Sequence, residues 1–471
     1  DCRGIPCFLT PNQAGACAHE QIPEAPADGC LVASAAIWTL CATDPERYHR
    51  RSGGKVPKRA NGGRGSLSLG SRTALDDRGQ QIDAGLRGGI AKIAQLRAYL
   101  QGASALGPEA QQVLGRLWDR APAEQPQAIR QVIRAELGQE PEALFREFVD
   151  EPLASASLGQ VHQAVGQDGK LLAVKVQYPG VAEALADDLD SAGVLKDLVG
   201  GDLGDAVSAE SLQGLRERLL SELDYRAEAD NLRRFRRLFA FDPDVVIPDV
   251  VADRSTGKVL TMERIIGRSL PEVARDGSDE QRSSAAQTIL RFALDCPIRH
   301  GVINVDPNPG NYLILNGNES GPGAKVGFLD FGCVAEIPEE LQKADRALYW
   351  AMIKRDGEAL RYAAHLEGLI PSASAFDNST YRRWEKLLSA PFLEREPVRL
   401  TPEYVKELGE LTWLLVQGRK MALPPQTLLL WRQRLGILAV VSALRPALHF
   451  RELLAHVLED GHPIPMLQRY P

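Results

Sequence analysis

The spacing of apolar residues predicts helices early in the chain. Ile90, Ile93 and Leu96 recur every three residues, and Leu100 follows four residues later. This spacing places all four on one face of a helix. We expect that helix at residues 84–100 and two more at 108–119 and 126–137, where prolines and a closing glycine supply start and stop signals.

The pattern then changes to one typical of strands, at residues 144–149, 157–165 and 171–178. Gly166, Asp168 and Gly169 separate the last two and predict a hairpin. A long helical region that ends with 214–239 follows, and then strands at 245–251 and 258–262. After residue 283 the chain reads as helical, except for a short hairpin at 312–315 and 325–329. This order of helices, a small mostly antiparallel sheet and a helical lobe predicts an α+β fold.

We expect four segments along the chain. Residues 1–75 are a poorly ordered, Cys-containing and basic segment, and residues 76–140 form a helical extension. Residues 141–265 form a smaller lobe that combines the sheet with a long helix. Residues 266–471 form the helical lobe.

Composition narrows the class of protein. Apolar residues make up 44% and charged residues 25% of the 471 positions, which is ordinary globular usage. The 55 basic and 62 acidic residues give a net charge of −7, which argues against a dedicated nucleic-acid binder. No uncharged apolar run is long enough to predict a transmembrane helix.

The first 75 residues carry two further features. Five of the seven cysteines lie within the first 41 residues, but none has the CxxC spacing of a zinc site. Between residues 47 and 72 there are eight Lys or Arg and no acid. That run is either a solvated linker or a segment attracted to an anionic membrane surface.

The strongest chemical signal lies in the second half of the chain. Asp306 and Asn311 are separated by four residues in a loop rich in Pro and Gly, and Asp330-Phe331-Gly332 follows after a hairpin. In kinases the first Asp orients the attacking hydroxyl, whereas the Asn and the second Asp hold Mg²⁺ against the phosphates of ATP. A lone Asp-Phe-Gly could be a simple turn, but the ordered pair of motifs is specific. We therefore predict Asp306 as catalytic, and Asn311 and Asp330 as metal ligands.

Lys175 stands in a strand among apolar neighbours. A buried ammonium needs an anionic partner, which in kinase chemistry is the nucleotide phosphates together with a helix carboxylate. The candidates for that carboxylate are Glu222, Asp224 and Glu228. The alternatives are a lysine that reaches solvent from an edge strand and a solvated acidic helix face.

The nucleotide site departs from that of an ordinary protein kinase. Where such kinases place a glycine-rich loop over the phosphates, this chain carries Ala154, Ser155, Ala156 and Ser157. Their side chains limit close backbone approach, which argues against protein-kinase activity. Ala173, Met262 and Glu263 are expected to line the adenine pocket and the hinge between the lobes, with plain core packing as the alternative.

In these motifs and their order the sequence resembles the AarF/UbiB atypical kinases, also called the ubiquinone-biosynthesis kinase-like family. The resemblance covers roughly residues 84–460. It implies a two-lobed protein-kinase-like fold with an N-terminal helical extension, and ATP and Mg²⁺ as cofactors. Position by position, it implies that Lys175 contacts the phosphates, that Glu228 pairs with Lys175, and that Glu222 and Asp224 form the family's Glu-x-Asp motif.

The family also carries a Lys-x-Gly-Gln motif on an N-terminal helix that folds over the active site. Here Lys92 and Gln95 match it, with Ala94 in place of the glycine. The resemblance therefore implies a regulatory role for both residues, and ATPase or small-molecule chemistry more than protein phosphorylation. Asn304 and Asn308 stand where bacterial members often have histidine.

We expect an ATPase that supports ubiquinone or other isoprenoid-lipid metabolism, in the cytoplasm or peripherally at a membrane surface. Its expected partners are ATP and an isoprenoid lipid or an anionic membrane, and not nucleic acid. One alternative is a small-molecule phosphotransferase of the aminoglycoside or choline kinase type. Another is a nucleotide-gated scaffold without hydrolysis. The sequence leaves the phosphoryl acceptor and the oligomeric state open.

Overall fold

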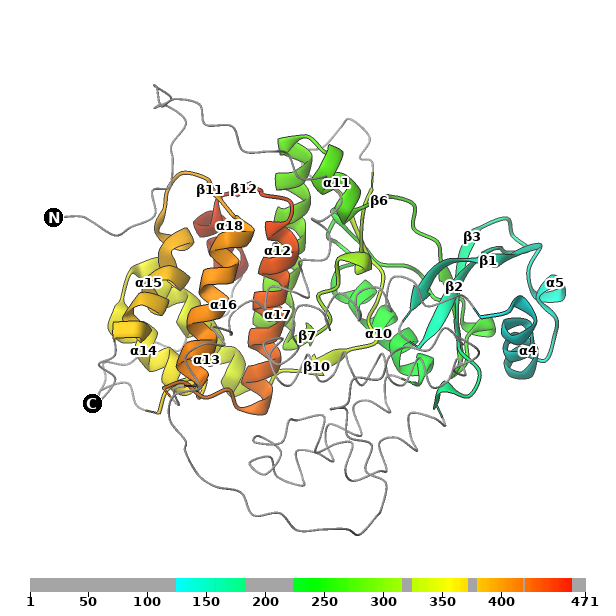
Figure 1. Cartoon of the computed structure of the whole chain (residues 1–471), viewed down its shortest axis with the longest axis horizontal. Coiled ribbons are helices and arrows are strands. Elements are labelled where there is room, and N and C mark those ends of the chain that lie inside the picture. The colour runs from blue at the N-terminus through cyan, green and yellow to red at the C-terminus, as the bar shows by residue number, and fades with distance from the viewer. Residues whose placement is uncertain are drawn as a thin grey trace, which may run out of the picture.

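The computed structural model describes residues 124–156, 158–182, 223–315, 324–371, 379–417 and 420–459. A small lobe built on a sheet lies at one end of the molecule, and a larger helical lobe lies at the other (Figure 1). The α+β, two-lobed prediction is confirmed. Of the expected N-terminal helices, only the last falls within these residues, as α4 (Pro126–Leu137) with the expected bounds. The others lie outside the described residues.

The small lobe is a four-stranded antiparallel sheet in the order β1-β2-β3-β5, with a helix on each face. Its strands are β1 (Glu147–Ala156), β2 (Gly159–Val165), β3 (Leu171–Gln177) and β5 (Val259–Glu263). Alternate residues of β3 point to opposite faces. Leu172, Val174 and Val176 pack in a buried cluster with Ile129 and Ile133 of α4.

The other face of the sheet receives α10 (Tyr225–Leu238). Ala173 of β3 shares a buried cluster with Leu232 and Phe235 of this helix. Lys175 lies two residues after Ala173 on the same strand, so the alternation of β3 aims its side chain toward α10 as well.

The first strand does not begin where the sequence predicts. Residues 141–144 form the short helix α5 (Pro141–Leu144), because Pro141 favours the first turn of a helix. The strand starts at Glu147 and runs on through Ala156, with irregular register on both sides of Pro152. Proline is tolerated there because β1 is an edge strand. The predicted strand 157–165 correspondingly begins at Gly159.

A second small sheet connects the lobes, in the order β4-β9-β8-β6. It contains the expected hairpin as β8 (Tyr312–Ile314) and β9 (Val326–Phe328), together with β4 (Val245–Val246) and β6 (Arg268–Ser269). The predicted strand 245–251 is therefore mostly wrong. The strand ends at Val246 and its two residues pair with β9, whereas Val250, beyond Pro248, forms an isolated antiparallel bridge with Met262 of the main sheet.

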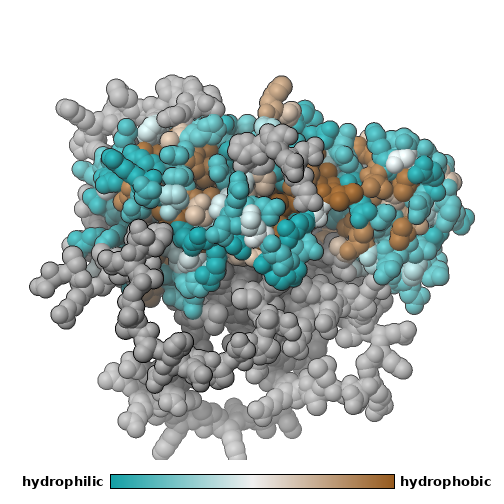
Figure 2. All heavy atoms as spheres, turned by 90° about the horizontal axis from the view of Figure 1, so that it is seen from above, coloured by the Kyte–Doolittle hydropathy of each residue, from teal (hydrophilic) through white to brown (hydrophobic). Residues whose placement is uncertain are grey.

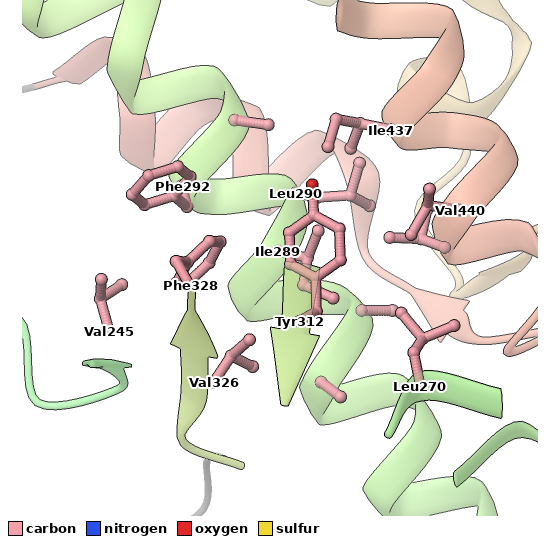
Figure 3. Close-up of a cluster of buried hydrophobic side chains, with 14 of the residues drawn as sticks. Val245, Leu270, Ile289, Leu290, Phe292, Tyr312, Val326, Phe328, Ile437 and Val440 are labelled. Carbon is pink, nitrogen blue, oxygen red and sulfur yellow. The ribbon is translucent and has the colours of Figure 1, made fainter. Parts of the chain in front are cut away.

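The large lobe is organised around α12 (Asp279–His300), against which the second sheet packs. The rings of Phe292 and Phe328 stack at 4.0 Å between centroids (Figure 3). This lobe also contains two short pairs of antiparallel strands. β7 (Val302–Asn304) pairs with β10 (Val334–Glu336), and β11 (Val398–Arg399) pairs with β12 (Ala447–Leu448). The other helices are α11 (Leu270–Asp276), α13 (Glu339–Lys354), α14 (Gly357–Leu366), α15 (Ser379–Leu393), α16 (Pro402–Gln417), α17 (Pro425–Ser442) and α18 (Phe450–Glu459).

No helix within the described residues is long and apolar enough to cross a membrane. Figure 2 shows hydrophilic residues over much of the coloured face, interrupted by apolar ones. The exposed large apolar side chains come from separate elements, and such single residues are normal on a protein surface. They are Leu153, Leu171, Phe241, Ile266, Leu366 and Leu414.

The helical lobe encloses a buried charged group. The Arg434 guanidinium lies 5.0 Å from the ring centroids of Tyr349 and Trp431 and forms an ion pair with Asp345. A second carboxylate, Glu367, is 2% exposed and accepts a hydrogen bond from Trp431 Nε1 at 3.0 Å. Burial raises the pKa of Glu367 to about 8. One guanidinium thus faces two carboxylates, since Arg434 also lies 3.6 Å from Glu367 Oε1.

We expect Glu367→Gln to flatten the pH dependence of stability. The pKa of Glu367 is near 4.5 in the unfolded chain and about 8 in the folded protein. At a pH between these two values the side chain must therefore take up a proton on folding. Its contribution is therefore fully present below pH 4.5 and is lost as pH rises toward 8, by up to about 1.4 kcal/mol per pH unit. Glutamine keeps the acceptor for Trp431 but does not titrate. Urea unfolding from pH 5 to 8 measures this, and parallel curves for both proteins would contradict it.

Candidate active site

The centre of the site is an ion pair between β3 and α10. Lys175 Nζ lies 2.8 Å from both Glu228 Oε1 and Glu228 Oε2. Both side chains are almost fully buried, with exposed fractions of 10% and 4%. The predicted pairing of these two residues is thus present in the structure, and the alternative of a lysine that reaches solvent is not.

A third group joins this pair from the Asp-Phe-Gly motif. Asp330 Oδ2 lies 3.1 Å from Lys175 Nζ, and Asp330 Oδ1 accepts a hydrogen bond from Gly332 N at 2.9 Å. The following Phe331 is fully buried, and its ring lies 4.6 Å from that of Phe235 on α10. The motif is therefore fixed from both sides, by an ion pair and by aromatic packing.

The electrostatics of the cluster keep the lysine charged. Burial alone would lower the pKa of Lys175, but the carboxylates of Asp330 and Glu228 outweigh it and hold that pKa well above its usual value. A permanent ammonium at this position is what a phosphate-binding lysine requires.

The start of α10 is held in place by the strand that carries the lysine. Gln177 Nε2 donates hydrogen bonds to the carbonyl oxygens of Leu223 and Gly257, and Tyr225 N donates to Gly257 O at 2.9 Å. The side chain of Asp224 caps the helix by accepting from Arg226 N. Asp224 thus has a structural role, whereas its predicted regulatory role stays a prediction.

The predicted catalytic loop lies between β7 and β8. Asn311 Nδ2 is 3.3 Å from Asp306 O and 3.5 Å from Asp306 Oδ2. Asn308 shapes the turn between them by accepting from Gly310 N at 3.0 Å. Asn311 O in turn accepts from Leu329 N, one residue before Asp330. The loop therefore brings Asp306, Asn311 and Asp330 into one connected group.

Asn304 joins the catalytic loop to the Asp-Phe-Gly motif. Its Nδ2 donates to Asp330 O at 2.7 Å, and its Oδ1 accepts from Asp306 N at 3.2 Å. Asn231 of α10 adds a hydrogen bond to Phe331 O at 3.0 Å. Sequence reasoning noted Asn304 only as a departure from the family's histidine and did not identify Asn231, because neither residue type signals a role without its distant partner.

Helix α17 packs against the predicted catalytic loop. Arg432 Nε donates to Val305 O at 3.1 Å. One helical turn further on, Gly436 lies so close to Pro307 that a Cβ added to it would meet Pro307 Cγ at 2.2 Å. A glycine is therefore required there for the loop and the helix to approach each other.

The donor set fits a magnesium ion that is shared with a nucleotide. Asn311 bonds to Asp306 through its amide nitrogen, so these bonds do not use its amide oxygen, and Asp330 carries a carboxylate. Within the described residues no group of three or more His, Cys, Asp or Glu could hold a metal by itself. Mg²⁺ is commonly bound by only one or two protein carboxylates, with phosphates and water completing its coordination.

The residues expected on the nucleotide side occupy neighbouring strands. Ala173 and Met262 pair across β3 and β5, and both are buried. Glu263 is exposed at the end of β5, where the chain passes toward the second lobe. The expected loop at Ala154–Ala156 is instead the end of β1, because Ala154 and Ala156 pair with β2.

Several predicted residues lie outside the part of the chain that the structure describes. They are Lys92, Gln95, Ser157 and Glu222. For Ser155 and Ala156 the structure describes the backbone only, as part of β1.

Three features together define a kinase-like protein. They are a sheet lobe with a lysine–glutamate pair, a helical lobe with Asp-x4-Asn, and an Asp-Phe-Gly motif between the two lobes. A family model described as "ABC1 atypical kinase-like domain" matches residues 116–364, which is more than half of the chain. The chain therefore belongs to the ABC1 atypical kinase family, and the predicted resemblance and enzyme class are confirmed.

Individual relatives agree with this assignment. The chain is 30% identical to the mitochondrial atypical kinase COQ8B of Rattus norvegicus over 78% of this chain and 69% of the relative. It is 30% identical to the mitochondrial atypical kinase COQ8 of Saccharomyces cerevisiae, but over only 57% of this chain and 52% of that protein. Among solved structures, the Mycobacterium tuberculosis protein Rv3197, in complex with erythromycin, matches with a TM-score of 0.59 and 27% identity over 79% of this chain and 93% of that one.

We expect Asn304→Leu to reduce Mg-ATP turnover by roughly tenfold or more, because it removes two hydrogen bonds that hold Asp306 and Asp330 in register. Phosphate release is measured beside Gln342→Leu, which removes a comparable hydrogen bond to Ile337 O at the start of α13. Equal turnover in the two variants would show that Asn304 has no special role in the loop.

Proposed function

We propose that this protein binds Mg-ATP between its two lobes and hydrolyses it. The observation that carries the proposal is the placement of Lys175 between Glu228 and Asp330, with 2.8 and 3.1 Å contacts. In kinases that lysine contacts phosphate oxygens, and the aspartate holds the metal. Asp306 then orients the attacking group, which is water in an ATPase.

The Ala-Ser segment supports hydrolysis over protein phosphorylation. The backbone of β1 is paired with β2 up to Ala156, and a side chain at each position limits how closely the main chain can approach phosphates. The family resemblance points the same way, since the family's N-terminal helix occupies the place of a protein substrate. We assign Lys92 and Gln95 to that helix by resemblance alone.

The lipid part of the proposal is that hydrolysis supports ubiquinone or another isoprenoid-lipid pathway at a membrane surface. Its support is the membership in a family that includes the COQ8 atypical kinases. The basic run between residues 47 and 72 is the segment that we propose to contact anionic lipid.

A second candidate is transfer of phosphate to a hydroxyl of a small molecule. It is favoured by the complex of the M. tuberculosis relative with erythromycin, a small molecule that carries several hydroxyl groups. The two candidates differ in the acceptor only, so the fate of the γ-phosphate distinguishes them.

We expect purified protein to release phosphate from Mg-ATP faster with vesicles of phosphatidylcholine and phosphatidylglycerol than with phosphatidylcholine alone. Asp330→Asn should lower the rate by roughly 100-fold, because a metal carboxylate is lost. The exposed Asp253 provides the matched control, Asp253→Asn, which should leave turnover unchanged.

Two outcomes would change the assignment. Binding of ATP by calorimetry without any release of phosphate would favour the non-hydrolysing scaffold. Phosphate recovered on an added hydroxyl compound such as erythromycin, detected by mass spectrometry, would favour the phosphotransferase.

A further inference from the structure

The lysine at the centre of the site touches an aromatic ring as well as two carboxylates. Lys175 Nζ lies 5.0 Å from the ring centroid of Tyr225, the first residue of α10. The ring is 2% exposed. A cation within about 6 Å of a ring centroid and over its face is attracted by the ring's quadrupole, and more strongly where water is excluded.

We propose that the ring of Tyr225 positions the Lys175 ammonium for the nucleotide phosphates. This inference rests on the proposed function, because it assigns a role within the same site. Tyr225 is a positioning residue, since it acts through the lysine and not on the substrate.

The Tyr225 ring attracts the ammonium in a different way from the two carboxylates. Glu228 binds Nζ with both oxygens, and Asp330 is also the predicted metal ligand. A lysine has four rotatable bonds and a compact charge, and its three N–H donors are taken up by these carboxylate oxygens. The ring of Tyr225 adds a further attraction without adding a negative charge or needing a donor.

The ring is held firmly relative to the lysine. Tyr225 N donates to Gly257 O, and Gly257 O also accepts from Gln177 Nε2 at 3.2 Å. Gln177 lies two residues after Lys175 on β3. The same strand therefore fixes both the lysine and the start of the helix that carries the ring.

The hydroxyl of Tyr225 does not explain the placement of its ring. It is buried and makes no hydrogen bond within the described residues. It faces the backbone near Gly159, where an added Cβ would lie 2.9 Å from it. A buried hydroxyl without a partner costs stability, so the hydroxyl gives no reason for placing a tyrosine here. The interaction that the side chain does make at this position is that of its ring with the Lys175 ammonium.

The test alters the quadrupole of the ring while keeping its shape. Tyr225→Phe serves as the reference, and pentafluorophenylalanine is introduced at the same position by nonsense suppression. Fluorination reverses the sign of the charge on the ring face. We expect kcat/KM for Mg-ATP to fall by roughly tenfold from the Phe form to the fluorinated form, at a temperature where thermal unfolding shows both forms to be fully folded. Equal kcat/KM in the two forms would overturn the inference, because a ring that only packs is indifferent to fluorination.

A second measurement separates this inference from the proposed function. Lys175 is acetylated with acetic anhydride at one fixed pH without nucleotide, and its rate is followed by mass spectrometry relative to the exposed Lys343. We expect Lys175 to react several-fold faster in the fluorinated form than in the Phe form. If the wild-type protein releases no phosphate but this difference is present, the proposed hydrolysis fails and the positioning role stands. If phosphate is released but the rates are equal, the positioning role fails alone.

Discussion

A buried ammonium between two carboxylates is the interaction on which the site depends. Lys175 contacts Glu228 of α10 and Asp330 of the Asp-Phe-Gly motif, which is 155 residues further along the chain. An unpaired charge in this position would be very costly, so the three side chains must come together whenever the chain is folded. The pair sets α10 against β3, and the third contact links the sheet lobe to the Asp-Phe-Gly motif.

The catalytic loop is held by different forces. Asn304 joins it to Asp330 through neutral hydrogen bonds, and α17 supports it through Arg432 and through the close contact of Gly436 with Pro307. These contacts are made to backbone atoms or to Pro307, and not to the carboxylates of Asp306 and Asp330. The loop can therefore be held rigid without using those carboxylates, which suits the preorganisation of a site.

The sequence was informative where a signal is local. Asp306, Asn311 and Asp330 are read from short motifs, and α4 and β3 from the period of their apolar residues. It failed where pairing is distant. Residues 245–251 look like one strand, yet only Val245 and Val246 form one, paired with β9, and beyond Pro248 the chain bridges to β5 through Val250. The start of β1 was misplaced because an edge strand has little burial pattern. Asn304 and Asn231 have meaning only beside Asp330 and Phe331.

The charges of the site also decide how a nucleotide can enter. Asp306, Asp330 and Glu228 bring three carboxylates, and Lys175 is bonded to two of those acids. A triphosphate that approached these carboxylates alone would be repelled by them at short range. A divalent cation that enters with the nucleotide would offset that repulsion. If Asn311 and Asp330 hold that cation as predicted, they supply it with few protein ligands, and phosphates would complete its coordination. A site of this kind would couple metal binding to nucleotide binding.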